Sequence, residues 1–367
     1  MVDNLKACES AQVAYYPYVE PKHGEGAGLL EALAKNAAVL VSDDYPAFFL
    51  PAMHQAVAKR VSVRMELVDS NGLMPLSVPE KTFSTAYSFR GYLQKNLKPF
   101  LSERPQAHPF SGFDLPRATV PAEVRDRWPA ADLDWLEGGS LASLAIDHTV
   151  GAPRGVKGGA TEGLRLIDEF LGGILGRYGE DRNEPEKRGT SQLSPHLHYG
   201  HVSTHEIFHG LSERESGWSV ERVPDKGRGS REGWWKMSAP AEGFLDELIT
   251  WREIGYNMAF REGARYEEYE SLPDWAQVTL DAHRDDPRDH VYDLEAFESA
   301  ATHDRLWNAA QNQLVREGRI HNYLRMLWGK KILEWTERPE DAQAIMVELN
   351  NKYALDGRDP NSYSGIM

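Results

Sequence analysis

The chain has 367 residues, enough for two domains of ordinary size, and a net charge of −15 at pH 7. That charge argues against non-specific coating of nucleic acid, which needs a broad basic surface, but it allows a local grip on DNA. No apolar stretch could span a bilayer and no signal peptide is visible, so we expect a cytoplasmic protein without membrane contact. The single cysteine, Cys8, excludes an intramolecular disulfide.

Residues 13–68 alternate between strand-like and helix-like patterns. Apolar runs at 13–19, 38–42 and 63–68 predict strands, and the segments at 29–36 and 48–61 predict helices. This order implies a doubly wound parallel sheet. Because such sheets commonly have more than three strands, we expect residues 1–101 to form an incomplete α/β domain.

The rest of the chain predicts a linker followed by helices. Residues 102–160 are rich in proline, glycine and charge and have weak periodicity, which favours a long linker with short helices. From about Leu164 the apolar spacing is helical and strand signals vanish. We therefore expect residues 161–367 to form an all-α domain.

Two motifs suggest other functions. The glycines at 24, 26 and 28 lie where a dinucleotide fingerprint would be found, but G-x-G-x-x-G needs glycine where Leu29 stands, which argues against a nicotinamide site. His205, Glu206 and His209 form a formal H-E-x-x-H, the pattern of a zinc hydrolase. A helix capped by Ser203 is the simpler interpretation, because histidines abound here and no acidic third ligand stands out. We predict no metal, with the zinc hydrolase as an alternative.

A locally basic segment stands out from the acidic background: Arg222, Lys226, Arg228, Arg231 and Lys236. Only Asp225 and Glu232 oppose these cations, and Trp234 and Trp235 lie among them. A solvated loop is the simpler interpretation, and a local grip on DNA is the other.

The stretch TSQLSPHLHYG, residues 190–200, gathers hydroxyls and backbone N–H groups at a turn leading into a helix. Such a turn can cradle a diphosphate without cationic side chains. A capped helix start would also explain the hydroxyls. The whole stretch, however, resembles the T-S-x-L-S-P-x-L-x-[FY]-G segment of the photolyase and cryptochrome family, which binds the phosphates of FAD.

Glu247 and Trp251 are four residues apart in FLDELITWRE and so share one helix face. By itself, this pair would indicate a core tryptophan and a glutamate bound to a surface arginine. The resemblance instead implies a substrate pocket, in which the glutamate hydrogen-bonds or protonates a pyrimidine dimer and the tryptophan stacks on a flipped-out thymine.

The C-terminal run contains WNAAQ, LRMLWGKKILEWT and LNNKYALDGRDPN. Packing of a helical stripe would explain Trp328 and Trp335, but their spacing of about 10 Å along one face also suits electron hopping, with Trp307 as third member. Asn350 continues the buried stripe of the next helix. It would either cap that helix or, as the resemblance implies, face flavin N5.

Together these stretches resemble a class II cyclobutane pyrimidine dimer (CPD) photolyase, from about Val13 to the end. The resemblance implies FAD contacts from Tyr178, Thr190, Ser191, Gln192, Leu193, Ser194, Arg325, Asn350, Asp356, Arg358 and Asp359. Arg325 and Asp356 would form a buried ion pair beside the flavin ring. Lesion contacts would come from Glu247, Trp251, Asn322 and Met326, although class II members often have glycine in place of Asn322. Catalysis would rest on Glu247, Trp251, Asn350, Trp307, Trp328 and Trp335.

The implied activity is that of a deoxyribodipyrimidine photo-lyase: light-driven repair of dimers in DNA by electron transfer from reduced FAD. We expect a monomer, with a second, antenna chromophore of unknown identity. A cryptochrome-like blue-light receptor is the main alternative. Family members start earlier and continue past the segment that ends at Met367, with a second tryptophan that clamps the dimer, so we expect a sequence truncated at both ends.

Overall fold

The computed structural model describes residues 1–9, 11, 13–112, 116–138 and 140–367. Its N-terminal part contains a parallel pair of strands, β1 (Val39–Asp43) and β2 (Arg64–Val68), in which Val39 lies opposite Arg64. The helix α3 (Leu50–Ala58) supplies the crossover that parallel strands need. The predicted strands at 38–42 and 63–68 are thus confirmed to within one residue at each end.

The strand predicted at residues 13–19 is wrong, since these residues form neither strand nor helix. Pro17 has no N–H to give to a sheet ladder, and its carbonyl accepts a bond from the backbone N–H of Ala131 at 2.7 Å. The aromatic side chains of this run pack beside Trp128 instead. The apolar run is thus a partly buried segment without regular secondary structure.

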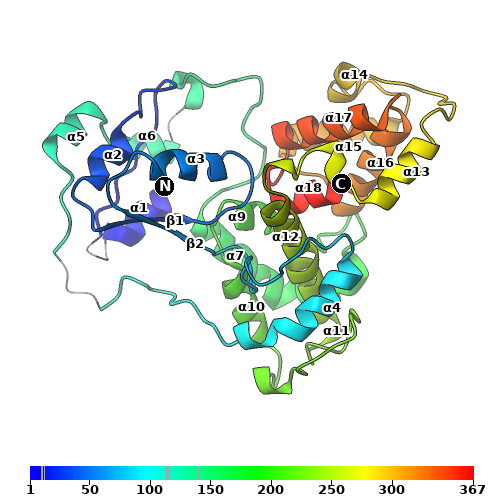
Figure 1. Ribbon diagram of the computed structural model, residues 1–367, viewed down its shortest axis with the longest axis horizontal. Helices are drawn as coiled ribbons and strands as arrows, with labels where there is room; N and C mark the ends of the chain where they lie inside the picture. Colours follow the sequence, from blue (N-terminus) through cyan, green and yellow to red (C-terminus); the bar gives the residue numbers. More distant parts are fainter. Residues whose placement is uncertain (10, 12, 113–115, 139) are drawn as a thin grey trace.

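Outside this sheet, the described elements are helices (Figure 1). Those before residue 160 are α1 (Val2–Glu9), α2 (Leu29–Ala34), α4 (Ala86–Asn96), α5 (Ala122–Arg127) and α6 (Leu133–Gly138). Those that follow are α7 (Ala160–Glu169), α8 (Tyr178–Asp181), α9 (Ser194–His198), α10 (Thr204–Ser212), α11 (Ala239–Leu245), α12 (Arg252–Glu262), α13 (Asp274–Ala282), α14 (Leu294–Glu298), α15 (Arg305–Glu317), α16 (Asn322–Glu334), α17 (Pro339–Tyr353) and α18 (Pro360–Ile366).

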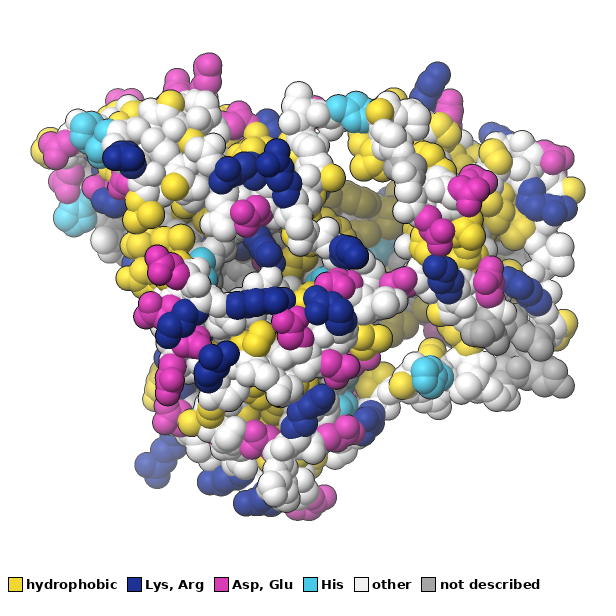
Figure 2. Space-filling view, turned by 180° about the vertical axis from the view of Figure 1, so that it is seen from behind, with side chains coloured by type: hydrophobic (Ala, Val, Ile, Leu, Met, Phe, Trp, Pro, Cys, Tyr) yellow, Lys and Arg dark blue, Asp and Glu magenta, His cyan; other side chains and the backbone are white. Residues whose placement is uncertain are grey.

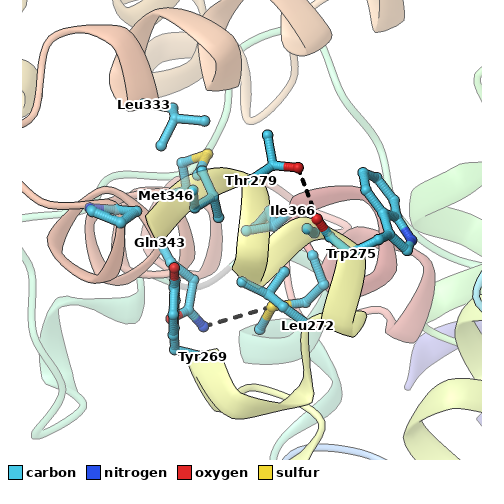
Figure 3. A pocket seen from close by; sticks show the side chains of 12 residues that line it. Tyr269, Leu272, Trp275, Thr279, Leu333, Gln343, Met346 and Ile366 are labelled. Carbon is cyan, nitrogen blue, oxygen red and sulfur yellow. Dashed lines mark hydrogen bonds between the residues drawn. The ribbon is translucent and has the colours of Figure 1, made fainter. Parts of the chain in front are cut away.

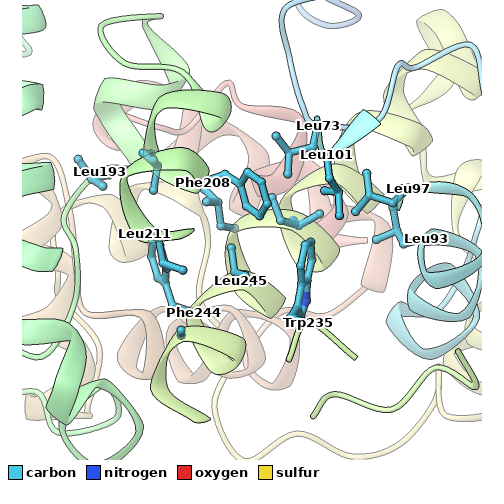
Figure 4. Close-up of a cluster of buried hydrophobic side chains, with 14 of the residues drawn as sticks. Leu73, Leu93, Leu97, Leu101, Leu193, Phe208, Leu211, Trp235, Phe244 and Leu245 are labelled. Carbon is cyan, nitrogen blue, oxygen red and sulfur yellow. The ribbon is translucent and has the colours of Figure 1, made fainter. Parts of the chain in front are cut away.

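The largest hydrophobic core joins residues 73–101 to the helices between residues 166 and 254. Figure 4 shows Leu93 of α4 and Leu97, which caps the end of α4, beside Leu101, in one cluster with Phe208 and Leu245. The domain boundaries at residues 101 and 160 stay predictions. The packing nevertheless groups residues 73–101 with the helical part.

A second core lies among α14, α15, α16 and α17. Asp304 fixes the start of α15 by accepting bonds from the N–H groups of Leu306 and Trp307 at 2.8 and 3.0 Å. Gly318 ends the helix at φ 67°, a left-handed conformation that glycine adopts without strain. None of the helices in the described ranges is long and apolar enough to cross a membrane.

Candidate functional site

The turn at Thr190–Ser194 alternates in backbone handedness. Gln192 has φ 60°, in the left-handed region, and Leu193 after it is right-handed. Such alternation turns successive N–H groups toward one side and makes a concavity that suits an anion. Leu193 is 1% exposed and anchors the turn in the core, while Arg319 donates a hydrogen bond to Gln192 Oε1. A non-glycine residue in this conformation is uncommon and is often functional.

Tyr178 lies at the start of α8, upstream of this turn in the sequence. Its ring is buried edge-on against Phe170 and Phe244, with the Arg182 guanidinium 5.3 Å from the ring centroid. Burial raises the pKa of the tyrosine hydroxyl, so the ring is a neutral wall. Arg182 also donates from Nη2 to Glu247 Oε1 at 2.5 Å and so links α8 to the predicted lesion residues.

Glu247 and Trp251 lie on a π-helical turn, η6 (Asp246–Trp251), between α11 and α12. π-Helical turns occur frequently at functional sites. Trp251 is 45% exposed, so it is not the core residue that the simpler interpretation required. Glu247 does pair with an arginine, as that interpretation expected. The predicted lesion residues of α16, Asn322 and Met326, are both exposed.

Arg325 is the centre of a polar cluster at the C-terminal end of the chain. It donates to Asp356 Oδ1 at 3.0 Å, to Asn350 Oδ1 and to Ser362 Oγ at 3.1 Å. The predicted ion pair with Asp356 is therefore present, although both side chains keep some exposure, 27% and 17%. Three acceptors on one guanidinium fix its plane.

Asn350 is 2% exposed, and both ends of its amide bind the protein. Oδ1 accepts from Arg325, and Nδ2 donates to the carbonyl of Gly357 at 2.8 Å. A Cβ on Gly357 would lie 2.1 Å from the Asn350 carbonyl oxygen, so glycine is required there. Nδ2 retains a second hydrogen, which is what a flavin contact would use.

Asp359 is buried on the other side of the same loop. It accepts from the Tyr256 hydroxyl at 2.8 Å, which itself accepts from Arg252, and it lies 3.5 Å from His198 Nδ1 of α9. Burial alone would raise the pKa of Asp359, but the His198 hydrogen bond and the Arg252 charge outweigh it and lower the pKa. The carboxylate thus ties the loop at 356–359 to α9 and α12.

The three tryptophans are all buried and form a row of ring contacts, here called the tryptophan stack, which is parallel between Trp307 and Trp328 and edge-on between Trp307 and Trp335. Trp307 lies between the other two, with ring centroids 6.3 Å from Trp328 and 6.2 Å from Trp335. The Trp307 and Trp328 rings are nearly parallel, and Trp307 Nε1 donates to the Trp328 carbonyl at 3.1 Å. Rings at such spacing can pass an electron from one to the next.

These contacts assemble the predicted segments around one region. Arg319 joins the 190–194 turn to the start of α16, Arg182 joins α8 to η6, and His198 joins α9 to the loop at 356–359. The donors suit FAD: hydroxyls and N–H groups for a diphosphate, and a guanidinium with an amide for a ring. Within the part of the chain that the structure describes, His321 Nε2 and Asn351 Oδ1, just before α16 and next to Asn350, are buried without a hydrogen-bond partner.

A cavity of about 970 Å³ lies between the N-terminal and helical parts. It is lined by β1 and α3 on one side and by α9 and α10 on the other, and Figure 2 shows the surface hollowed between these parts. Of the predicted cofactor residues only Arg358 lines it, with its guanidinium 4.8 Å from the Phe48 ring centroid. A smaller, apolar cavity of about 230 Å³ between α13, α17 and α18 contains no predicted site residue (Figure 3).

The H-E-x-x-H segment lies on α10, whose start is capped by Ser203, as predicted, through a bond from the N–H of Glu206 at 3.0 Å. His205 and His209 have ring centroids 6.3 Å apart, and His209 Nε2 lies 3.0 Å from the Glu103 carbonyl. Among the residues that the structure describes, no group of three histidine, cysteine, aspartate or glutamate side chains could hold a metal ion. The geometry therefore gives the zinc hydrolase no support.

Comparison with known proteins identifies the relatives. The chain is 36% identical to the deoxyribodipyrimidine photo-lyase of Potorous tridactylus over 303 residues, 82% of this chain and 50% of that protein. It is 33% identical to the deoxyribodipyrimidine photo-lyase of Methanothermobacter thermautotrophicus over 312 residues, 84% of this chain and 60% of that protein. The chain belongs to the photolyase/cryptochrome family. No protein-family model matches it.

The fold of the photolyase/cryptochrome family is also found among solved structures. A class III photolyase from Agrobacterium tumefaciens matches with a TM-score of 0.58 at 19% identity, over 98% of this chain and 66% of that one. A Synechocystis cryptochrome matches with a TM-score of 0.63 at 17% identity, over 100% of this chain and 71% of that one. The chain spans half to about three fifths of the length of the two curated photo-lyases.

Sequence reasoning missed several residues of this family member's site. Arg182, Arg319 and Ser362 bind predicted site residues directly, and Arg252 and Tyr256 hold Asp359. Arg252 and Tyr256 are four residues apart on α12, which is a visible signal for a side-chain pair. The long-range partners give no such signal, because 103 residues separate Tyr256 from Asp359.

Proposed function

We propose that this chain comes from a class II CPD photolyase that repairs pyrimidine dimers in DNA with light. The observation that carries the proposal is the exposure of Trp251 beside Glu247, because a family member that only sensed light would have no need of an open aromatic plate there. The names of the curated relatives support the same activity. All the residues proposed for repair belong to one chain, which agrees with a monomer.

FAD is the proposed cofactor. Bound FAD would supply the light-absorbing ring and the electron that splits the dimer. Thr190–Ser194 would hold its phosphates, Tyr178 would pack against it, and Arg325, Asn350, Asp356 and Asp359 would fix the ring. Arg358 faces the other cavity, so a FAD contact from it would need its side chain to turn.

The lesion would be handled by exposed side chains. Trp251 offers a flat face on which a flipped-out base can stack, and extrusion of a dimer is cheap because its pairing is already damaged. The Arg182 guanidinium keeps Glu247 in place, and the glutamate would hydrogen-bond the dimer. Trp328, Trp307 and Trp335 would relay electrons through the core.

The 970 Å³ cavity is the proposed site of an antenna chromophore. It lies at the carboxyl ends of β1 and β2, where open parallel sheets bind ligands, and its volume suits a ligand larger than a single ring system. His198, Tyr199 and Phe48 line it with flat rings.

A cryptochrome-like photoreceptor is the second candidate, because the fold match to the Synechocystis cryptochrome is as good as that to the photolyase. The tryptophan stack serves both functions. Relatedness favours repair: the named cryptochrome relative from Arabidopsis thaliana matches only 17% of the chain, at 35% identity.

The test is light-dependent repair of a dimer-containing oligonucleotide by the purified protein, with the flavin measured by absorbance. We expect Glu247→Gln and Trp251→Ala to retain flavin and to slow repair by at least about tenfold. Repair by the wild type, together with slower repair by these two flavin-containing variants, would support the proposal. A flavin-containing wild type that repairs nothing would favour the photoreceptor, and a protein that takes up no flavin would refute both.

A further inference from the structure

The loop at residues 222–236, here called the basic loop, differs in charge from the rest of the molecule. It carries five cationic and two acidic side chains in a chain of net charge −15. Asp225 Oδ1 forms an ion pair with Lys98 Nζ at 2.7 Å, which neutralises one of the two acidic side chains of the loop. Lys226, Arg228 and Lys236 are exposed, and within the described ranges none has a carboxylate within 4.0 Å. Their charge is therefore available to a partner.

The backbone of the basic loop is pinned to α4. Gly229 donates its N–H to Gln94 Oε1 at 2.7 Å, and Gln94 Nε2 donates to the Ser230 carbonyl at 2.7 Å. A Cβ on Gly229 would lie 3.1 Å from the Tyr87 carbonyl, and one on Gly227 would collide with Gln94. The two glycines thus let the loop approach the helix closely, beside α11 (Figure 1).

The tryptophans of the basic loop face inward. Trp234 and Trp235 are 5% and 7% exposed and belong to the main core, and the Trp235 carbonyl accepts from Trp218 Nε1 at 2.8 Å. They therefore serve as anchors, and stacking on nucleic-acid bases is not their role. A loop fixed at its glycines and its tryptophans presents its cations in set positions, unlike a solvated charge run.

The basic loop also contacts the turn that carries the proposed lesion residues. Arg231 Nε binds Asp246 Oδ2 at 3.2 Å, and Asp246 directly precedes Glu247 on η6. Asp246 is buried and also binds Arg90 at 2.6 Å, so the joint is firm. Through Asp246 the basic loop is therefore joined to the turn on which Trp251 lies.

We propose that the basic loop binds the phosphate backbone of the DNA that flanks the lesion, through Lys226, Arg228 and Lys236. This inference rests on the proposed function. Phosphate contacts position a protein on DNA without reading sequence, and each releases counterions, so binding weakens as salt rises. Because the chain as a whole is acidic and repels DNA, a local basic contact of this kind permits it to dock on the duplex.

The experiment measures the affinity of the purified protein for a dimer-containing duplex between 50 and 200 mM salt. We expect Lys226→Ala/Arg228→Ala/Lys236→Ala to weaken binding on the order of tenfold at low salt and to reduce the salt slope by about 2 to 3. The matched control, Lys22→Ala/Lys35→Ala/Lys59→Ala, removes the same charge from exposed positions elsewhere and should leave the slope nearly unchanged. Flavin content and repair at saturating DNA should stay at wild-type values in both variants.

The outcomes separate the two proposals. A wild type without preference for dimer-containing DNA would contradict the proposed function. A wild type that binds the lesion, with equal slopes for the loop variant and the control, would overturn the role of the basic loop. Single Lys226→Gln and Arg228→Gln variants guard against misfolding, since each should lower the slope by about 1.

Discussion

At the scale of single residues, Arg325 is the side chain on which the proposed ring site depends most. From α16 it donates hydrogen bonds to three partners, Asp356, Asn350 and Ser362. Removing one partner of a partly buried ion pair costs more than the pair itself contributes, because the other charge is left desolvated.

Arg325→Met should therefore lower the free energy of unfolding by about 2 kcal/mol, less than for a fully buried pair because both side chains keep some exposure. It should also reduce the flavin bound per protein. Arg325→Lys should recover the charge but not the fork of three bonds, and give an intermediate loss. Arg305→Met, at an exposed position on α15, is the control. Equal flavin retention by Arg325→Met and the control would contradict the assignment.

At this scale, the sequence predicted side-chain contacts best where the residues are neighbours along the chain or belong to one long motif. The Arg325–Asp356 pair was predicted and is present, 31 residues apart, because both lie in the C-terminal motif run. Arg358 belongs to the same motif, yet its side chain faces Phe48 and the other cavity, since a motif fixes the residue type and not its direction. The Arg252, Tyr256 and Asp359 chain depends on tertiary packing and was not foreseen.

At the scale of elements, α15 and α16 hold the tryptophan stack together. Sequence spacing placed Trp328 and Trp335 on one helix face but could not reveal that Trp307 of α15 lies between them. Loss of the Trp307 ring would interrupt the electron route between Trp328 and Trp335, because electron transfer slows steeply with distance.

Trp307→Phe should slow light-driven reduction of the bound flavin by an external reductant, while repair by chemically reduced protein continues. Phenylalanine retains most of the apolar packing, and only the bond to the Trp328 carbonyl is lost. Trp275→Phe, at a 65% exposed position on α13, provides the control. If Trp307→Phe and Trp275→Phe are photoreduced equally fast, the stack is not the route.

The close packing of α12 on α18 positions the loop at 356–359. Gly255 makes it possible, since a Cβ there would lie 2.6 Å from the Asn361 Cα. Backbone atoms cannot move aside as a flexible side chain can, so we expect Gly255→Ala to cost about 3 kcal/mol and to loosen flavin binding. Gly243→Ala on α11 meets nothing within 4 Å and should be neutral or gain up to about 1 kcal/mol. Urea midpoints of the two variants measure the difference, and equal midpoints would contradict this account.

At the scale of the whole molecule, the N-terminal and helical parts meet at a buried acid. Glu253 of α12 is 4% exposed and accepts from the N–H of Leu73 at 2.7 Å, in the segment that leads from β2 to α4. A Cβ on Gly72 would lie 2.6 Å from the Glu253 carboxyl, so the chain approaches as closely as it can. The sequence could not reveal this junction, because periodicity reports elements and not which core they join.

Glu253 should make this junction sensitive to pH. Burial raises the pKa of its carboxyl from 4.5 to about 7, and the backbone bonds from Leu73 and Met74 only partly oppose that shift. The folded state therefore binds a proton more tightly than the unfolded state, and its stability falls as the pH rises from about 4.5 to 7. The loss amounts to about 3 kcal/mol at most.

Glu253→Gln should remove this part of the pH dependence, because the amide cannot ionise and its Oε1 can still accept from Leu73. Urea unfolding between pH 5 and 8 measures it: the wild type should lose stability relative to the variant as the pH rises, and the two should converge near pH 5. Glu268→Gln, at an exposed position, should follow the wild type throughout. Parallel curves for wild type and Glu253→Gln would mean that the carboxylate is solvated at neutral pH, and that the two parts of the molecule are joined less tightly than the packing of Gly72 against Glu253 implies.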